Sequence, residues 1–244
     1  MRGLPLGEGP PKLCLPLVAR TEEELLSFAQ EACTLRPDLV EWRIDAYEPA
    51  ASMPAALAAL ALLRRTLGAL PLLCTCRCRA EGGLQALPEA YRLSLLEAML
   101  ETGEVDLVDL ELSAGSAALG RISAAAHRAG AALIGSAHDF EQTPPVDAML
   151  ATLRAQQHAG ADIAKLAVMP RTLDDITALL DASRRFSAEA AIPLIAVSMG
   201  RLGLPSRLCG SLFSSAVLFG AGSRASAPGQ VPIGLLREIL RLAE

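Results

Sequence analysis

The stretch Asp162-Ile-Ala-Lys-Leu-Ala-Val-Met-Pro170 has the composition of a buried β-strand, except for one lysine, Lys165, in its middle. Short apolar runs of this kind recur along the chain, and most are followed by a turn and an amphipathic segment rich in alanine and leucine. This alternation predicts βα units that build a parallel sheet. Because a closed barrel of this kind has eight strands and eight such runs are present, the sequence predicts a (β/α)8 TIM barrel of the α/β class.

The predicted strands span residues 13–18, 39–43, 70–76, 105–110, 132–136, 163–168, 193–197 and 216–219. The predicted helices span residues 22–34, 54–67, 88–102, 117–129, 146–159, 173–187 and 233–242, with a shorter one within 201–209. Thr21 and Glu24 have the spacing of a capping box at the start of the first helix. A doubly wound open sheet is the alternative, but no glycine-rich phosphate loop follows the first strand.

Length and composition favour a single domain. The chain has 244 residues, 52% hydrophobic and 20% charged, which is enough to bury a core of barrel size. Residues 1–11 are rich in glycine and proline and are expected to form a flexible head, so residues 12–244 would form the catalytic barrel. The net charge is −5, without long runs of like charge, and aromatics make up 3% of the chain. This argues against nucleic acid or an anionic membrane as partner.

The cysteines bear on the compartment and on metal binding. No apolar signal-peptide core or membrane-spanning run is present, so we expect a cytoplasmic protein whose six cysteines are free thiols. Cys74, Cys76 and Cys78 alternate along one predicted strand and would share a face. Their spacing is not C-x-x-C, and no histidine cluster accompanies them, so buried structural thiols are favoured over metal ligands.

A lysine inside an apolar strand requires a physical explanation. Burial disfavours the charged ammonium, so Lys165 can become a nucleophile toward a carbonyl, and Schiff-base chemistry is the first hypothesis. The alternative is that Lys165 ends an edge strand and reaches water, or pairs with Asp162. His138 follows the preceding strand, where it can meet Lys165 and act as general acid and base. A purely structural histidine is the alternative there.

Further polar residues occur near the ends of other strands, where barrel enzymes collect their functional groups. Glu41, Arg43 and Asp45 alternate along the second strand and are predicted to share a face. The remaining candidates are Arg77 after the third strand, Asp109 and Glu111 on the fourth, and Arg207, whose guanidinium suits a carboxylate. Small residues at 223–230 suit a lid that closes over substrate.

Taken together, these segments resemble type I 3-dehydroquinate dehydratase, a Schiff-base-forming family of the shikimate pathway. The motifs are Glu41-Trp-Arg-Ile-Asp45, Ser136-Ala-His-Asp-Phe140 with Thr143-Pro144, Asp162-Ile-Ala-Lys-Leu-Ala167 with Pro170, Met199-Gly200, Ser206-Arg207 and Ser226-Ala-Pro-Gly-Gln230. The resemblance extends over nearly the whole chain, and the motifs occur in the order found in the family. The resemblance implies a (β/α)8 barrel, no metal or organic cofactor, and loss of water from 3-dehydroquinate to give 3-dehydroshikimate.

The resemblance also implies roles for individual residues. Lys165 matches the imine-forming lysine and His138 the proton-transfer histidine of the family. The substrate-binding positions match Glu41, Arg43, Arg77, Arg207, Ser226 and Gln230, and supporting positions match Glu81, Asp109, Met199 and Phe219. In the implied mechanism Lys165 adds to the C3 ketone, the protonated imine acidifies C2, and His138 moves a proton from C2 to the departing C1 hydroxyl.

Three departures from the family pattern affect the expected packing around the substrate. Pro16 stands where many relatives carry serine, Val197 replaces a methionine, and Ser214 with Ser215 stands in place of a Phe-Gly-Ser pattern. Two other functions compete with the dehydratase. One is an aldolase-like lysine-imine lyase of sugar phosphates, and the other is a barrel that binds carboxylates without turnover. The resemblance further suggests a homodimer.

Overall fold

The computed structural model describes residues 2–243 and contains eight parallel strands in the order β7-β6-β5-β4-β3-β2-β1-β8. The strands are β1 (Lys12–Leu17), β2 (Leu39–Arg43), β3 (Leu72–Thr75), β4 (Leu107–Glu111), β5 (Ala132–Asp139), β6 (Ile163–Val168), β7 (Leu194–Ser198) and β8 (Val217–Phe219). A parallel bridge between Leu194 and Ser215 joins β7 to the residues just before β8, and the Ala216 N–H donates to Leu194 O at 2.7 Å. These contacts bring the two ends of the sheet together, and the predicted (β/α)8 fold in one domain is confirmed.

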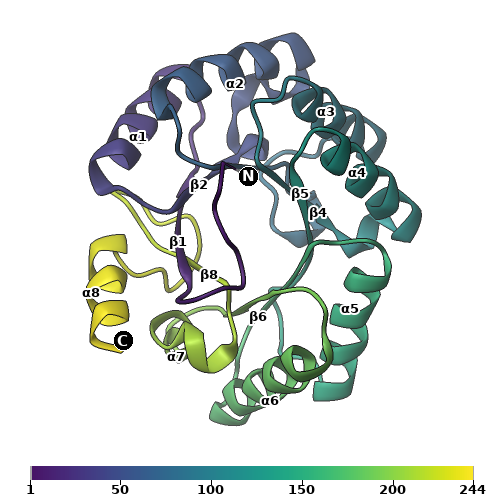
Figure 1. The fold of residues 1–244 in the computed structure, drawn as a ribbon, viewed down its shortest axis with the longest axis vertical. Coiled ribbons are helices and arrows are strands. Elements are labelled where there is room, and N and C mark those ends of the chain that lie inside the picture. Colours follow the sequence, from purple (N-terminus) through teal and green to yellow (C-terminus); the bar gives the residue numbers. More distant parts are fainter. Residues whose placement is uncertain (1, 244) are drawn as a thin grey trace.

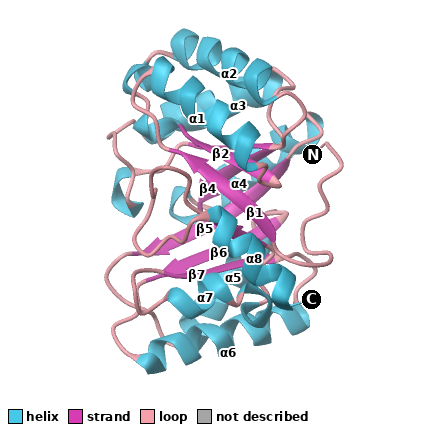
Figure 2. Cartoon of the chain, turned by 90° about the vertical axis from the view of Figure 1, so that its left-hand side faces the viewer, coloured by secondary structure: helices cyan, strands magenta, loops and turns pink. Residues whose placement is uncertain are grey.

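Helices surround the sheet, as Figure 1 shows in the view along the barrel. They are α1 (Glu22–Leu35), α2 (Met53–Leu67), α3 (Glu89–Glu101), α4 (Ser116–Arg128), α5 (Val146–His158), α6 (Leu173–Glu189), α7 (Leu204–Leu208) and α8 (Ile233–Ala243). Figure 2 shows the strands between helices on both sides. The apolar faces of the helices pack on the sheet, as Leu60 and Leu63 of α2 and Phe186 of α6 do. Within residues 2–243 no helix has the length and hydropathy needed to cross a bilayer.

The strands end earlier or later than the sequence pattern predicted at several places. β2 spans the predicted residues but continues into a 3₁₀ turn, Ile44–Ala46, so the predicted alternation of Glu41, Arg43 and Asp45 does not extend to Asp45. β3 ends at Thr75, whereas β5 runs on to Asp139. Each difference lies at the carboxyl end of a strand, where loop contacts replace the ladder that fixes strand geometry.

The capping box predicted at α1 is incomplete. Thr21 Oγ1 accepts the Glu24 N–H at 3.2 Å, but the Glu24 carboxylate accepts the N–H of Arg20 instead of that of Thr21. A complete box is found at α6, where Thr172 and Asp175 accept each other's backbone N–H. The predicted start of the helix is therefore confirmed, but the predicted hydrogen bond from the Thr21 N–H to the Glu24 carboxylate is not formed.

A layer of apolar side chains fills the amino-terminal end of the barrel, and the segment before β1 lies against it. Leu39, Leu107 and Ile195 belong to this layer, and Leu4 and Leu6 of the N-terminal segment pack on it. Figure 1 shows this segment crossing the barrel. The flexibility expected of residues 1–11 stays a prediction, with residue 1 outside the described range. Because the amino-terminal end of the barrel is filled, a cavity can form only at the carboxyl ends of the strands.

Candidate active site

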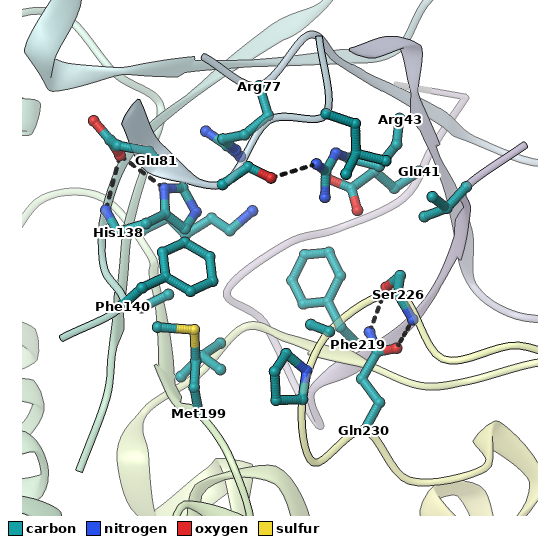
Figure 3. A pocket seen from close by; sticks show the side chains of 18 of the residues that line it. Glu41, Arg43, Arg77, Glu81, His138, Phe140, Met199, Phe219, Ser226 and Gln230 are labelled. Carbon is teal, nitrogen blue, oxygen red and sulfur yellow. Dashed lines mark hydrogen bonds and ion pairs between the residues drawn. The ribbon is translucent and has the colours of Figure 1, made fainter. Parts of the chain in front are cut away.

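A cavity of about 170 Å³ opens at the carboxyl ends of the strands. Asp45, Asp109 and Glu111 do not line it, whereas the other predicted site residues do, as Figure 3 shows for most of them. The lining also includes Val18, Gly82, Leu84, Phe140, Ala167, Val197, Ala227 and Pro228. The cavity therefore brings together groups from β2, β5, β6, β7 and β8, from α7, and from the loops at the carboxyl ends of the strands.

Lys165 projects from the middle of β6 and is 6% exposed. Its Nζ donates to Asp109 Oδ2 at 2.9 Å and lies 4.7 Å from the centroid of the Phe219 ring. β6 is hydrogen-bonded on both sides, to β5 and β7. The alternative of an edge-strand lysine is thus wrong, and so is pairing with Asp162, whose carboxylate instead contacts His127 and the Leu133 N–H.

Asp109 lies just below the cavity wall and is completely buried. Its Oδ1 accepts from Ser136 Oγ at 2.6 Å and from Arg77 Nη2 at 2.9 Å, while Oδ2 faces Lys165. Burial alone would raise the pKa of Asp109, but Arg77 and Lys165 hold that pKa far below its usual range. Asp109 is therefore a fixed anion beside the lysine.

Arg77 connects this anion to a second buried carboxylate. Its Nη1 donates to Glu111 Oε1 at 2.7 Å and to Ser136 Oγ at 2.9 Å, and Glu111 also pairs with Arg92. Burial by itself would lower the pKa of Arg77, but Asp109 and Glu111 raise it. Arg77 therefore bridges two buried carboxylates, and each group of this network has a partner of opposite charge.

His138 lies near the end of β5 with its ring buried against Glu81. Glu81 Oε2 lies 2.9 Å from both the His138 backbone N and ring Nδ1, as the dashed lines in Figure 3 show. Burial, followed by the positive charges of Arg77 and Lys165, lowers the pKa of His138 well below its ordinary value. A neutral ring that donates through Nδ1–H to Glu81 leaves Nε2 as the basic atom.

Arg207 in α7 is the cavity cation with the fewest partners. Its side chain is 5% exposed, and the hydrogen bond found for it runs from Nη2 to Pro228 O at 2.9 Å. Its Nε is buried without a hydrogen-bond partner, and no carboxylate of residues 2–243 forms an ion pair with it. Burial lowers the pKa of Arg207 to about 10, so it is still protonated at neutral pH. A buried, unpaired guanidinium is a site for an anion.

Glu41 and Arg43 point into the cavity from β2. Glu41 Oε1 accepts from Thr75 Oγ1 at 2.8 Å. Arg43 donates from Nε and Nη2 to the two oxygens of Asp45, each at 2.8 Å. Asp45 also accepts the N–H groups of Arg77 and Leu84, so it fixes the loop after β3. Asp45 thus organises neighbouring groups and does not itself line the cavity.

The loop between β8 and α8 covers one side of the cavity. Ser226 and Gln230 bind each other across it: the Ser226 N–H donates to Gln230 Oε1 at 2.6 Å, and Gln230 Nε2 donates to Ser226 Oγ at 2.7 Å. The loop touches the turn after β7, where the Gly200 N–H donates to Pro228 O. At Gly229, φ is +77° and a Cβ would come within 2.3 Å of Gly200 O, so only glycine fits this contact.

Some site residues were not predicted from the sequence. Phe140, 43% exposed, covers Gly82 at the cavity edge, and Thr75 and Ser136 orient the carboxylates of Glu41 and Asp109. The two hydroxyls lie at inward positions of their strands, so the period-2 pattern was the available signal. Phe140 and Ser136 were within a recognised motif, but no role was assigned to either.

The departures from the family pattern have unequal consequences. Val197 lines the cavity, as expected for a substrate-packing position. Pro16 is absent from the lining, and Ser214 and Ser215 lie before β8, at its amino-terminal end. Ser215 Oγ accepts the Ala196 N–H and so helps to close the barrel. Pro16 and Ser214 are therefore not residues of the cavity wall, and their effect on substrate packing stays a prediction.

The cysteines form no metal centre among residues 2–243, which contain no group of three or more His, Cys, Asp or Glu side chains suited to a metal. Cys74 and Cys76 are buried free thiols, and burial raises the pKa of Cys76 to about 12. β3 ends before Cys76, so the three cysteines do not share a continuous strand face as predicted.

Comparisons with known proteins agree with this geometry. The sequence matches the family of type I 3-dehydroquinases over residues 13–244. The 3-dehydroquinate dehydratase of Bacillus velezensis is 42% identical over 243 residues, 99% of this chain and 96% of that protein, and that of Bacillus subtilis is 41% identical over 241 residues, 98% and 94%. The crystal structure of 3-dehydroquinate dehydratase from Geobacillus kaustophilus is 40% identical, with a TM-score of 0.95 over 99% of this chain and 94% of that one. The type I enzyme of Clostridium difficile, crystallised with covalent modified comenic acid, is 35% identical, with a TM-score of 0.96 over 99% of this chain and 96% of that one.

Proposed function

The chain belongs to the type I 3-dehydroquinase family, hydro-lyases that convert 3-dehydroquinate to 3-dehydroshikimate and water in the shikimate pathway, and we propose that Lys165 forms the Schiff base of this reaction. The observation that carries the proposal is one cavity that holds a buried lysine, a neutral histidine and an unpaired arginine. Each of these groups supplies a separate requirement of the reaction.

Lys165 gives up a proton, adds through the neutral Nζ to the C3 carbonyl, and forms a protonated imine when the carbonyl oxygen, protonated in turn, departs as water. Asp109 supports this step because the lysine ammonium and the protonated imine carry the same positive charge at the same place. The carboxylate that faces Nζ at 2.9 Å can therefore stabilise the imine without moving. The cationic imine then withdraws electrons from C2 and makes its hydrogen acidic.

His138 is the proposed acid and base. Its Nε2 takes the proton from C2, which leaves an enamine, and then returns a proton to the C1 hydroxyl, which departs as water. Glu81 keeps the ring oriented through Nδ1 and stabilises the imidazolium that forms in between. Water finally hydrolyses the product imine and frees Lys165.

The remaining groups hold the substrate. Arg207 binds the C1 carboxylate, which fills the unmet hydrogen-bonding capacity of its Nε. The ring hydroxyls face Glu41, Arg43 and Arg77, and the lid brings Ser226 and Gln230 to the substrate. Met199 and Phe219 form apolar walls. Such fixed orientation supplies much of the rate of an enzyme of this kind.

Borohydride reduces an imine to a stable adduct and so tests the proposal directly. The adduct is easy to assign, because the chain contains only two lysines, Lys12 and Lys165. The protein is incubated with 3-dehydroquinate, reduced, digested and analysed by mass spectrometry. We expect an adduct on Lys165, its loss in Lys165→Met and its retention in Lys12→Met, since Lys12 lies at the opposite end of the barrel. An adduct confined to Lys12, or none at all, would contradict the proposed role.

We also propose a homodimer in the cytoplasm. The dimer rests on the family resemblance, and sedimentation or light scattering would measure its mass directly. The cytoplasm is supported by the six cysteines, all of which are free thiols in the structure, as expected where glutathione keeps thiols reduced. Fractionation of cells that produce the protein tests the location.

A further inference from the structure

Gln156 lies in the last turn of α5 and is completely buried. Met149, Leu150 and Leu153 of the same helix pack in the core between helix and sheet, so they fix the helix that carries it. Gly135 of β5 leaves room for this side chain: a Cβ at Gly135 would lie 3.3 Å from that of Gln156 and 2.8 Å from that of Ala161. The position is built for a side chain that reaches from the helix to the sheet.

The side-chain amide of Gln156 forms hydrogen bonds with both the N–H and the C=O group of the Lys165 backbone. Its Nε2 donates to Lys165 O at 2.9 Å, and its Oε1 accepts the Lys165 N–H at 3.1 Å. A primary amide supplies one donor and one acceptor in the same geometry as a peptide unit. The two bonds fix the Lys165 peptide groups on either side of Cα, from which the reactive side chain extends.

We propose that Gln156 is a positioning residue for imine formation, because it holds the backbone of Lys165 so that Nζ stays in reach of the substrate carbonyl. This inference rests on the proposed role of Lys165 as the imine-forming group. Gln156 does not line the cavity and touches no substrate. It acts on the rate of Nζ attack, whereas substrate affinity depends on Arg207 and the other groups of the cavity.

The test compares Gln156→Met with Gln157→Met. Methionine at 156 keeps the length of the side chain and removes both hydrogen bonds. Gln157 is the matched control, because it is the adjacent residue of the same helix and its Oε1 binds the Ala191 N–H instead of Lys165. Imine formation is followed in a single turnover by borohydride quenching at timed intervals.

We expect Gln156→Met to slow imine formation about 10- to 100-fold, the range that follows from small misplacements of a reacting group. KM should stay close to that of the wild type, and the Lys165 amide should exchange its hydrogen faster. Gln157→Met should match the wild type in all three measurements. A folded Gln156→Met protein that forms the imine at the wild-type rate overturns the proposal, whatever its melting temperature.

Gln156→Glu supplies an independent readout and a second variant in case the methionine protein does not fold. A protonated glutamic acid can donate to Lys165 O and accept from its N–H, whereas the carboxylate can only accept. The rate of imine formation relative to wild type should therefore fall as the pH rises from about 5 to 9. A ratio that does not vary with pH overturns the proposal. A wild-type protein without any adduct on Lys165 would instead contradict the function proposed above.

Discussion

Replacing Arg207 with methionine should impair substrate binding strongly while leaving the folded protein as stable as before, or more stable. Most buried arginines are paired with carboxylates, so their loss destabilises the fold. Arg207 makes a hydrogen bond to Pro228 O and has a buried Nε without a partner. Burial that lowers its pKa to about 10 also means that the folded state disfavours its charge. Removing the guanidinium removes that cost.

The effect on binding has the opposite sign. Removing one partner of a buried charge pair costs about 2–5 kcal/mol in binding. At about 1.4 kcal/mol for each factor of ten, kcat/KM should fall about 30-fold or more. Steady-state kinetics with 3-dehydroquinate measure this fall, and thermal melts of the ligand-free protein measure stability.

Arg77→Met is the matched control, because Arg77 is equally buried but pairs with Asp109 and Glu111. Its loss leaves two carboxylates short of a partner and should destabilise the protein by about 3–5 kcal/mol. The reasoning fails if Arg207→Met lowers the melting temperature as much as Arg77→Met does. It also fails if Arg207→Met leaves kcat/KM within about threefold of the wild type, since that corresponds to less than about 1 kcal/mol.

Three further predictions concern other groups in or next to the cavity. Asp109→Asn should lower kcat about 100-fold or more, the scale for removing a preorganised charge, because the protonated imine loses its anion; an unchanged single-turnover rate would exclude this role. For His138, the pKa in the folded state is lowered, so the unfolded chain binds the additional proton as the pH falls through about 6.5. Stability should therefore decline there, and urea melts of His138→Asn should lack that part of the decline. Gln230→Ala should raise KM more than it lowers kcat, because the lid contributes contacts and no proton transfer; steady-state kinetics that show the reverse split would argue against the lid.

The inward-facing residues could be predicted because strand periodicity alone decides which face a side chain occupies. Glu41 and Arg43 share the face that the alternation indicated, and the barrel brings them into one cavity with Lys165 and other residues from distant segments. Strand ends were less accurate, as Asp45 shows: its position in a 3₁₀ turn depends on bonds to Arg77 and Leu84, which lie more than thirty residues away.

The ion-pair and hydrogen-bond partners of the site residues could not be predicted, because these pairings depend on the register between strands and on the length of each side chain. Lys165 and Asp109 are 56 residues apart and lie on strands separated by β5. The sequence offered the nearby Asp162 as the partner, yet Asp162 lies at the start of the strand, where it binds His127 and the Leu133 N–H. Gln156 was not recognised for the same reason, since its pairing with the Lys165 backbone follows from how α5 packs on β6.

The distribution of partners among the cavity cations indicates how binding and closure are connected. Arg43, Arg77 and Lys165 each face a carboxylate of the protein, so their positions are set before substrate arrives. No carboxylate within residues 2–243 pairs with Arg207, and its Nη2 donates to Pro228 O, within the loop that carries Ser226 and Gln230. A carboxylate drawn to Arg207 therefore arrives beside the lid. On the proposed role of Arg207, the side chain that binds the substrate carboxylate also contacts this loop, and we therefore expect substrate binding to favour the closed position of the loop.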